Sequence, residues 1–374
     1  MSPTFTIALT ALLIIWVGYP VVIGCISALR RPDVDSPDPV AGSGTVSVIL
    51  ASCDDAQAIR ARVADLLATS YAADRVEVIV ALDARNGRAS PEELAGLDSR
   101  VVVVNGDDPG GKAAALNAAV RAARNEVLVF ADTAQRFNRA AIGDLVAALA
   151  GPRLGAVSGM LEWSGNAGRA SFAERYWRYE RWLRNREARV HSGVGVTGAI
   201  YAMRRALWEP LPAGVILDDV YAPMQLVLRG WQIGFAEHAI ATDTRGFAVG
   251  AEYRRKVRTL TGVLQVCAWL PSVLNPLRNP VWLQFVFHKL LRLLTPYLAI
   301  IVVVEAGRSM AALVTKPVGQ ELILFAALAA AVVVLVPRIR RRIGAPIVWG
   351  VALQTSIVVA TVNGLRGRWD VWQQ

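Results

Sequence analysis

The chain has 374 residues, 54% of them hydrophobic, and a positive mean hydropathy of +0.38. Such a length and hydropathy exclude a single small soluble domain and indicate a soluble domain joined to membrane segments. The formal net charge is +10, but arginines beside apolar segments explain part of it, so anionic membrane lipids are the expected partner and nucleic acid is not.

An apolar segment opens the chain. Phe5 to Leu29 contains no charged residue, and its roughly 25 residues suffice to cross about 30 Å of hydrocarbon, too long for a signal-peptide core. Arg30 and Arg31 follow directly, so the positive-inside rule places the N-terminus outside and the following domain in the cytoplasm. We therefore expect a retained membrane anchor over residues 1–31 and a linker, rich in Pro, Asp, Gly and Ser, over residues 32–45.

Short β-branched runs alternate with helical patterns in the next part of the chain. Four runs predict strands: Val46–Leu50, Val76–Leu82, Val101–Val104 and Val127–Phe130. Three segments between them predict helices: Ala56–Ala68, Pro91–Leu97 and Lys112–Ala123. This alternation is typical of a parallel sheet covered by helices on both faces. The expected fold class is therefore α/β, with a Rossmann-like domain over residues 46–250.

Acidic residues follow three of these predicted strands. Asp54 and Asp55 come after the first, Asp83 after the second and Asp132 after the fourth. Because the carboxyl ends of parallel strands meet at one edge, these acids are expected to share a nucleotide-sized site, with Asp132 a candidate holder of a metal-bound nucleotide. An alternative stays open, in which Asp132 or Thr133 only caps the next helix.

A glycine-rich segment precedes the third predicted helix. Gly106 to Lys112 spells G-x-x-x-x-G-K, but Ala113 lacks the hydroxyl with which a true P-loop binds magnesium. We therefore expect no P-loop here. Lys112 still stands at a helix N-terminus on the ligand edge, where it is able to neutralise a phosphate.

Two later segments combine aromatic and basic residues. Arg169 to Arg189 is helix-like, with Tyr176, Tyr179 and Leu183 on one stripe; it either lies on the membrane surface or presents a charged face to solvent over an aromatic core stripe. Val263 to Leu293 carries three prolines among tryptophans and phenylalanines, which predicts short interfacial helices leading into the bilayer. His288, within it, is interpreted as a packing or interface histidine.

The chain closes on apolar segments, and three spans are expected: Leu294–Val314, Leu322–Val336 and Pro346–Val362. Arginines at 338 and 340–342 fit a cytoplasmic loop between the last two. Glu305 is costly in lipid, so it faces a protein or water-lined interior or, as we favour, lies near the far interface. We thus expect a basic interfacial segment over 251–293 and membrane helices over 294–374, in a multi-pass inner-membrane protein.

The order of these segments resembles the family 2 glycosyltransferases with the GT-A fold, in particular the membrane-embedded branch that includes cellulose, hyaluronan and poly-N-acetylglucosamine synthases. The matching segments cover most of the chain from Val46 to Pro296: Val46–Leu50, Gly111–Asn117, Phe130–Asp132, Gly198–Arg205, Asp218–Asp219, Arg254–Arg258 with Gly262 and Gln265, and His288–Arg292. The resemblance implies a cytosolic GT-A domain with a mixed, mostly parallel sheet, joined to transmembrane helices.

The resemblance also implies how a nucleotide sugar, probably UDP-linked in this branch, is held. Asp132 would bind a divalent cation, Mn²⁺ or Mg²⁺, on the donor diphosphate, because a cation stabilises the charge that grows on the leaving group. Asp83 would hold the uracil or ribose. Lys112, Arg255 and Arg258 would contact the diphosphate, for which a guanidinium fork is suited; the basic run Arg254–Arg258 could alternatively lie on the membrane surface.

On the acceptor side, the resemblance implies an inverting transfer to a glycan in polysaccharide synthesis. Asp219 would be the base that takes the acceptor proton, with Asp218 as support or alternate. Gly198 and Ala199 would lie beside the acceptor and leave room for a sugar ring. The alternatives are that the two acids cap a helix over Tyr221–Leu228 and that the two small residues only allow close packing.

The chain departs from this family pattern in three places. Ala134 stands where many relatives carry a second acid, Ala51–Asp55 replaces a proline, asparagine and glutamate, and Arg255–Thr259 keeps only the arginine of Q-x-x-R-W. Two further functions are therefore considered: transfer of one sugar to a polyprenyl phosphate, and a non-catalytic scaffold subunit with a decayed site. The expected partners are the donor, a glycan or lipid-linked acceptor, membrane lipids, and a second copy or an accessory secretion subunit.

Overall fold

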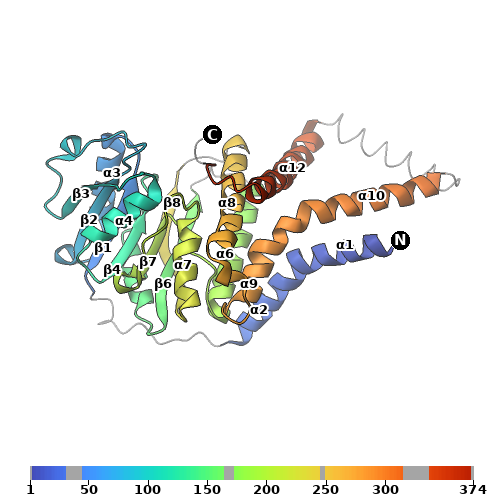
Figure 1. Ribbon diagram of the computed structural model, residues 1–374, viewed down its shortest axis with the longest axis horizontal. Helices are drawn as coiled ribbons and strands as arrows, with labels where there is room; N and C mark the ends of the chain where they lie inside the picture. Colours follow the sequence, from blue (N-terminus) through green and yellow to red (C-terminus); the bar gives the residue numbers. More distant parts are fainter. Residues whose placement is uncertain (1, 31–43, 164–171, 245–248, 315–336, 372–374) are drawn as a thin grey trace.

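Eight strands form one sheet that carries the edge where the predicted acids meet. The computed structural model describes residues 2–30, 44–163, 172–244, 249–314 and 337–371. The strands are β1 (Val46–Ser52), β2 (Val76–Leu82), β3 (Val101–Asn105), β4 (Val127–Ala131), β5 (Gln135–Phe137), β6 (Leu154–Trp163), β7 (Ile200–Arg204) and β8 (Gln232–Asp243). They lie in the order β3-β2-β1-β4-β7-β6-β8-β5 (Figure 1).

The sheet is mixed, as the resemblance implied. β1 pairs in parallel with β2 and β4, β2 with β3, and β6 with β8. β7 runs antiparallel to both β4 and β6, and β5 antiparallel to β8. The expected mixed, mostly parallel sheet is therefore confirmed, although the β-branched runs revealed only the parallel strands β1 to β4.

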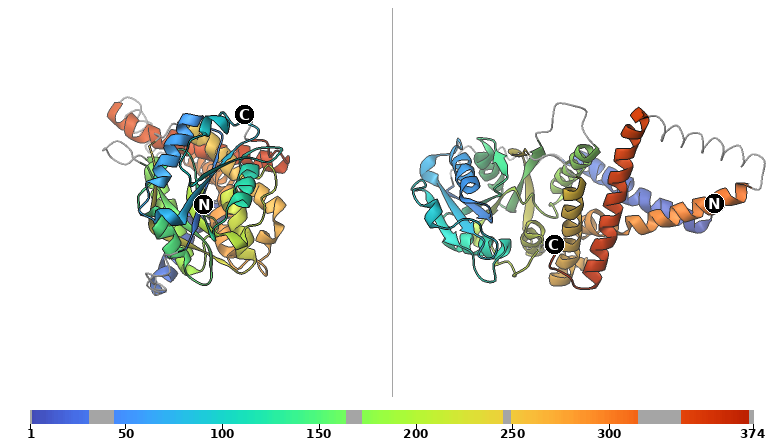
Figure 2. Two further views of the ribbon diagram at one scale, coloured as in Figure 1. Left: turned by 90° about the vertical axis from the view of Figure 1, so that its left-hand side faces the viewer. Right: turned by 90° about the horizontal axis from the view of Figure 1, so that it is seen from above.

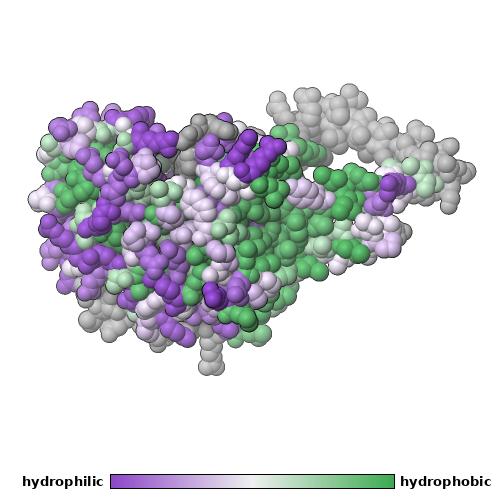
Figure 3. Space-filling view, viewed as in Figure 1, coloured by the Kyte–Doolittle hydropathy of each residue, from purple (hydrophilic) through white to green (hydrophobic). Residues whose placement is uncertain are grey.

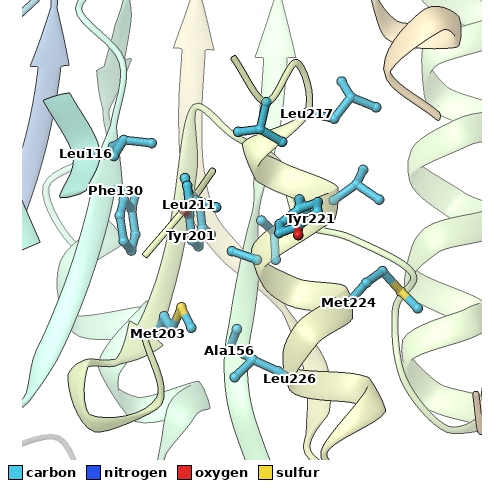
Figure 4. Packing of buried hydrophobic residues seen from close by; sticks show 14 of the residues in the cluster. Leu116, Phe130, Ala156, Tyr201, Met203, Leu211, Leu217, Tyr221, Met224 and Leu226 are labelled. Carbon is cyan, nitrogen blue, oxygen red and sulfur yellow. The ribbon is translucent and has the colours of Figure 1, made fainter. Parts of the chain in front are cut away.

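Helices cover both faces of the sheet. Alternate residues of β1 point to opposite sides, so that Val48 and Leu50 pack with α3 (Ala56–Leu67) and α5 (Ala141–Leu149). Ile49 belongs to the other core, with α4 (Lys112–Ala122), α7 (Asp218–Leu228) and α8 (Val249–Trp269). In that core the rings of Phe130 and Tyr201 stack at 4.2 Å beside α7 (Figure 4).

Two predicted helices differ from the structure. The segment Pro91–Leu97 contains only a short turn, Glu92–Leu94, because the Arg60 guanidinium donates to the carbonyl oxygens of Glu93 (2.6 Å) and Ala95 (2.8 Å), which are thereby withdrawn from helical bonds. The helix expected to follow Asp132 and Thr133 begins only at Ala141, because β5 precedes it. Asp132 and Thr133 lie before β5, so neither caps that helix.

Long helices extend from one end of the sheet domain. α1 (Pro3–Leu13), a π-helical turn (Ile14–Gly18) and α2 (Tyr19–Leu29) form one continuous segment. α9 (Trp282–Phe285) leads through two irregular turns into α10 (Thr295–Val314), and α12 (Pro337–Leu365) packs against α8. α1 and α10 run side by side away from the sheet (Figures 1 and 2).

Three of these segments are long and apolar enough to cross a membrane: Pro3–Leu29, Trp282–Ala312 and Ile347–Leu365. The apolar surface gathers over this end of the molecule, while the sheet domain is largely hydrophilic outside (Figure 3). The predicted span Leu322–Val336 lies outside the described residues. The arginines at 338 and 340–342 belong to the helical segment of α12, not to a loop between helices.

The remaining segments connect the sheet to these helices. α6 (Phe172–Val190) packs on α2, where Leu183 is buried with Tyr19 and Ile23. Glu305 of α10 accepts hydrogen bonds from Ser2 (2.5 Å) and Arg308 (3.0 Å), so it lies at the end of the α1–α10 pair remote from the sheet. This position is consistent with the far-interface interpretation of Glu305.

Candidate active site

A cavity of about 340 Å³ opens where β4 ends, between the sheet, α6, α7 and α8. It brings together the site residues predicted from the sequence except Asp83, Asp54 and Asp55. Asp55 instead caps α3, and Asp54 pairs with Arg88 at 3.0 Å, so these two acids do not share the site. The predicted residues in its wall are Lys112, Asp132, Gly198, Ala199, Asp218, Asp219, Arg255 and Arg258. Segments that are more than a hundred residues apart in the chain therefore share one enclosed space.

Lys112 bridges two carboxylates of the cavity. Its Nζ lies 3.1 Å from Oδ1 of Asp132 and 3.4 Å from Oδ2 of Asp218. Burial by itself would lower the pKa of Lys112, but the Asp132 and Asp218 carboxylates outweigh it and raise that pKa. The ammonium is therefore retained, at the N-terminus of α4, where the positive end of the helix dipole adds to its field.

Asp83 supports this arrangement from outside the cavity wall. Its Oδ1 accepts a hydrogen bond from the backbone amide of Gly111 at 2.7 Å and from that of Arg85 at 2.9 Å. Gly110 and Gly111 both have positive φ, 83° and 90°, a conformation that L side chains disfavour. Asp83 thus fixes the turn that delivers Lys112. Its expected role at the base or ribose of the donor stays a prediction.

Asp218 and Asp219 occupy the first turn of α7. The helix starts at Asp218, not at Tyr221, and its N-cap, Leu217, makes no side-chain capping bond. The capping interpretation was therefore wrong, because both acids lie inside the helix with their carboxylates on the cavity. A Cβ added to Gly198 would lie 3.3 Å from Oδ2 of Asp219, so glycine keeps this carboxylate accessible.

The Asp219 carboxyl has a raised pKa in the cavity wall. Burial and then the neighbouring Asp218 carboxylate raise its pKa to about 6, against the opposing effects of Lys112, Lys289 and Arg258. A carboxylate with such a pKa is ionised at neutral pH and takes up a proton more readily than an ordinary aspartate. These are the properties of a general base.

The two arginines of the basic run differ in their surroundings. Arg255 pairs with Glu252 at 3.0 Å, and its guanidinium lies 4.4 Å from the Trp177 ring centroid. Burial lowers the pKa of Arg258, while the Asp219 and Asp218 carboxylates oppose that shift, so Arg258 lies within electrostatic range of both acids. Of the two, Arg258 faces the carboxylate cluster more directly.

Gln135 is a cavity residue that the sequence analysis missed. Its Nε2 donates to Oδ2 of Asp243 at 2.8 Å, and since a carboxylate only accepts, this bond fixes which end of the amide is oxygen. The Oε1 atom is buried and has no hydrogen-bond partner among the described residues. Its position three residues after Asp132 was the available signal.

An oxygen-lined cation site fits these residues. Within the described ranges no three His, Cys, Asp or Glu side chains are grouped to hold a metal. Asp132 nevertheless supplies a carboxylate and Gln135 an unpaired carboxamide oxygen on the same cavity. Mg²⁺ and Mn²⁺ take oxygen ligands of this kind together with substrate phosphates.

The far end of the cavity is built from the apolar segments. Trp16, Lys289 and Ile357 line it, one from each of the three candidate spans. His288 is buried beside them and pairs through Nδ1 with Glu187 at 2.8 Å and through Nε2 with Glu180 at 3.0 Å. The two ring nitrogens each lie against a buried carboxylate, so this histidine belongs to a buried polar network and is not a simple packing residue.

Comparison with known proteins agrees with this architecture. The family described as "Glycosyltransferase like family 2" matches residues 43–262. The structure resembles the mannosyltransferase PcManGT from Pyrobaculum calidifontis in complex with GDP-Man and Mn²⁺, with 19% identity, a TM-score of 0.69, and coverage of 97% of this chain and 99% of that chain. S. aureus TarS 1–349 gives 14% identity, a TM-score of 0.41 and coverage of 62% and 66%. No curated protein matches the chain.

Proposed function

Because the chain belongs to glycosyltransferase like family 2, and so is a glycosyltransferase that uses a nucleotide sugar, we propose that it transfers one sugar with inversion to an acceptor at the membrane surface. One observation carries this proposal. A single cavity joins the Lys112–Asp132 edge, the Asp219 carboxylate and side chains of all three candidate spans. A donor bound at that edge, the proposed base Asp219 and an acceptor that reaches the candidate spans therefore share one cavity.

The donor diphosphate is proposed to bind at the sheet edge. Lys112 and Arg258 supply positive charge there, and Asp83 holds the turn before Lys112 in place. Asp132 and Gln135 would hold a divalent cation, Mn²⁺ or Mg²⁺, which when bound stabilises the negative charge on the leaving diphosphate. We propose UDP as the nucleotide, with GDP as the alternative to test, because the similar mannosyltransferase was solved with GDP-Man.

Asp219 is proposed to activate the acceptor. The acceptor hydroxyl oxygen forms a bond to the anomeric carbon while the bond from that carbon to the diphosphate oxygen breaks. The nucleoside diphosphate leaves with the electron pair, and the hydroxyl proton passes to the Asp219 carboxylate. Asp218 keeps the pKa of Asp219 high, and Lys112 offsets the charge of both acids.

The proposed acceptor is a growing glycan held at the cytosolic face of an inner membrane. Gly198 and Ala199 leave space beside Asp219, and Trp163 and Trp177 line the same cavity, where aromatic rings are able to contact a sugar. Transfer to a polyprenyl phosphate is the second candidate, because the cavity reaches the apolar segments. A multi-pass topology with the sheet domain in the cytoplasm belongs to both proposals.

Purified protein in detergent, tested with UDP- and GDP-sugars and Mn²⁺ or Mg²⁺, should release the nucleoside diphosphate and form a glycosylated product. Asp219→Asn should abolish transfer while the nucleoside diphosphate still binds in calorimetry. Full transfer by that variant would remove Asp219 from its role as base. If no nucleoside diphosphate binds with either cation, the chain is better explained as a scaffold subunit with a decayed site.

A further inference from the structure

The membrane end of the cavity holds two cations, besides the ion-paired Arg292, that the proposed donor site does not use. Arg184 lies on α6, and Lys289 lies in the turn Val286–Leu290 between α9 and α10. Both side chains line the cavity. A lysine inside a segment apolar enough to cross a membrane is costly, and such residues commonly mark a ligand or ion pathway.

These two cations differ from the other basic residues of the wall. Most of the others are paired with an acid, as shown by Lys112 with Asp132, Arg181 with Glu162, Arg255 with Glu252 and Arg292 with Glu180. Lys256 instead lies over the Tyr176 and Trp177 rings, 4.6 and 4.9 Å from their centroids. Among the residues that the structure describes, Arg184 and Lys289 form no ion pair and no side-chain hydrogen bond. Two like charges that face one cavity without a carboxylate partner form a site for an anion.

The position of this anion site separates it from the donor. Lys112 interacts with Asp132, Asp218 and Asp219, whereas Lys289 interacts with Asp219, Glu180 and Arg184. Lys112 lies at the N-terminus of α4, whereas Arg184 and Lys289 come from α6 and from the segment that leads into α10, and all three line the cavity with Asp219. An anion bound by the Arg184–Lys289 pair therefore occupies a different part of the cavity wall from the donor diphosphate.

We propose that Arg184 and Lys289 bind a phosphate group of the acceptor, and that the acceptor is a lipid whose head group carries this phosphate close to a hydroxyl nucleophile. The inference rests on the proposed function, since it needs Asp219 as base. A hydroxyl nucleophile needs a base such as Asp219, whereas an ionised phosphate used as nucleophile would not. The Arg184–Lys289 pair then orients the head group, and the lipid chains extend along the apolar segments.

Two lipid sources share this chemistry: a hydroxyl-bearing glycerophospholipid and a sugar carried on a polyprenyl diphosphate. The test presents phosphatidylglycerol and a polyprenyl-diphosphate-linked monosaccharide in separate mixed micelles. The donor is the UDP- or GDP-sugar from which the purified protein releases the nucleoside diphosphate in the assay above. Diacylglycerol, which has a hydroxyl and no phosphate, and polyprenyl monophosphate, which has a phosphate and no hydroxyl, are the comparison lipids. Transfer to either of the first two, at least tenfold above both comparison lipids, is expected and identifies the source.

Variants make the test specific to the two cations. Arg184→Gln and Lys289→Gln should each raise the acceptor KM about tenfold, as expected when a charged hydrogen bond is lost, and Lys289→Arg should recover most of the loss. Arg178→Gln, an exposed arginine of the same helix outside the cavity wall, is the matched control and should leave this KM unchanged. Thermal unfolding and nucleoside diphosphate binding verify that each variant is folded.

Four outcomes would each overturn this inference. Three concern the acceptor: equal transfer to diacylglycerol, transfer to polyprenyl monophosphate alone, and transfer only to soluble sugars. The fourth is an acceptor KM that neither Gln variant changes. Failure of the proposed function is a separate result: the unaltered protein would then neither bind a nucleoside diphosphate nor hydrolyse any donor.

Discussion

Pro223 determines what the backbone carbonyl of Asp219 contacts. Proline has no N–H, so its presence four residues after Asp219 leaves that carbonyl without its helical donor. The vacant position is taken by the backbone amide of Val196, which donates to Asp219 O at 2.8 Å. A proline inside α7 thus ties the loop that carries Gly198 and Ala199 to the residue proposed as base.

Replacing Pro223 by alanine should loosen this connection. The new N–H at residue 223 would compete with Val196 for the Asp219 carbonyl, and a hydrogen bond of this kind is worth about 1 kcal/mol. We expect kcat to fall about fivefold, with the donor KM unchanged. Steady-state kinetics check this, and an unchanged kcat would show that the Val196 contact does not position the acceptor loop.

The activity should depend on pH through the Asp219 carboxyl. Its pKa is raised to about 6, and only the ionised form accepts a proton, so kcat should fall as pH drops through that value. At pH 5 about one tenth of the plateau rate should remain. Asp218→Asn removes the second largest cause of the raised pKa, so the midpoint of the profile should move to lower pH. A profile without a limb near pH 6 would contradict this role.

Lys112 should matter for the donor more than for the fold. Lys112→Met leaves Asp132 and Asp218 without their shared cation and removes charge from the diphosphate site, so the donor KM should rise about tenfold or more. Arg121→Gln on the same helix breaks only an exposed pair with Asp107 and should change little. Calorimetry with UDP and GDP provides the measurement; equal affinities of the two variants would refute the assignment.

Restoring the acid that relatives carry at position 134 should strengthen cation binding. Ala134 is partly exposed beside Asp132, so Ala134→Asp adds a carboxylate ligand for Mn²⁺ or Mg²⁺. The Mn²⁺ concentration needed for half-maximal binding in the presence of UDP should decrease about tenfold, measured by calorimetry. Gln135→Leu should increase it. If both variants keep the original value, the cation is not held at Asp132 and Gln135.

The His288 network should contribute to stability. His288→Gln removes the ring that bridges the buried Glu187 and Glu180 carboxylates at 2.8 and 3.0 Å, and leaving a buried polar group without its hydrogen-bond partner costs about 1–3 kcal/mol. Thermal unfolding in detergent should show a lowered midpoint. His238→Gln, at an exposed position, is the control and should leave the midpoint unchanged. A variant His288→Gln as stable as the original protein would show that these contacts do not stabilise the fold.

The strand-end acids were predictable because β1 to β4 are local β-branched runs whose parallel order places their carboxyl ends together. Asp132 and Lys112 follow from that order, and the resemblance added Asp219. The site assignments themselves stay predictions for the experiments above. β6, β7 and β8 were not recognised, because their antiparallel and crossover pairings depend on contacts between segments far apart in the chain.

The buried polar network escaped prediction for a similar reason. Glu180 and Glu187 lie seven residues apart and share one face of α6, which was a usable signal. Their partner His288 comes from a segment about a hundred residues later, and no local pattern connects the two. Gln135 was likewise missed, because the hydrogen bond that orients its amide is made to Asp243, a residue at the end of β8.

Only part of the cavity wall lies within the segment that the family matches. The family match spans residues 43–262, which contain Asp132, Lys112 and Asp219, whereas Trp16, Lys289 and Ile357 lie outside it. Under the acceptor assignment proposed above, substitutions in the apolar segments should change which acceptor is glycosylated and leave donor binding unchanged. The family match would then predict the reaction of this protein better than its product.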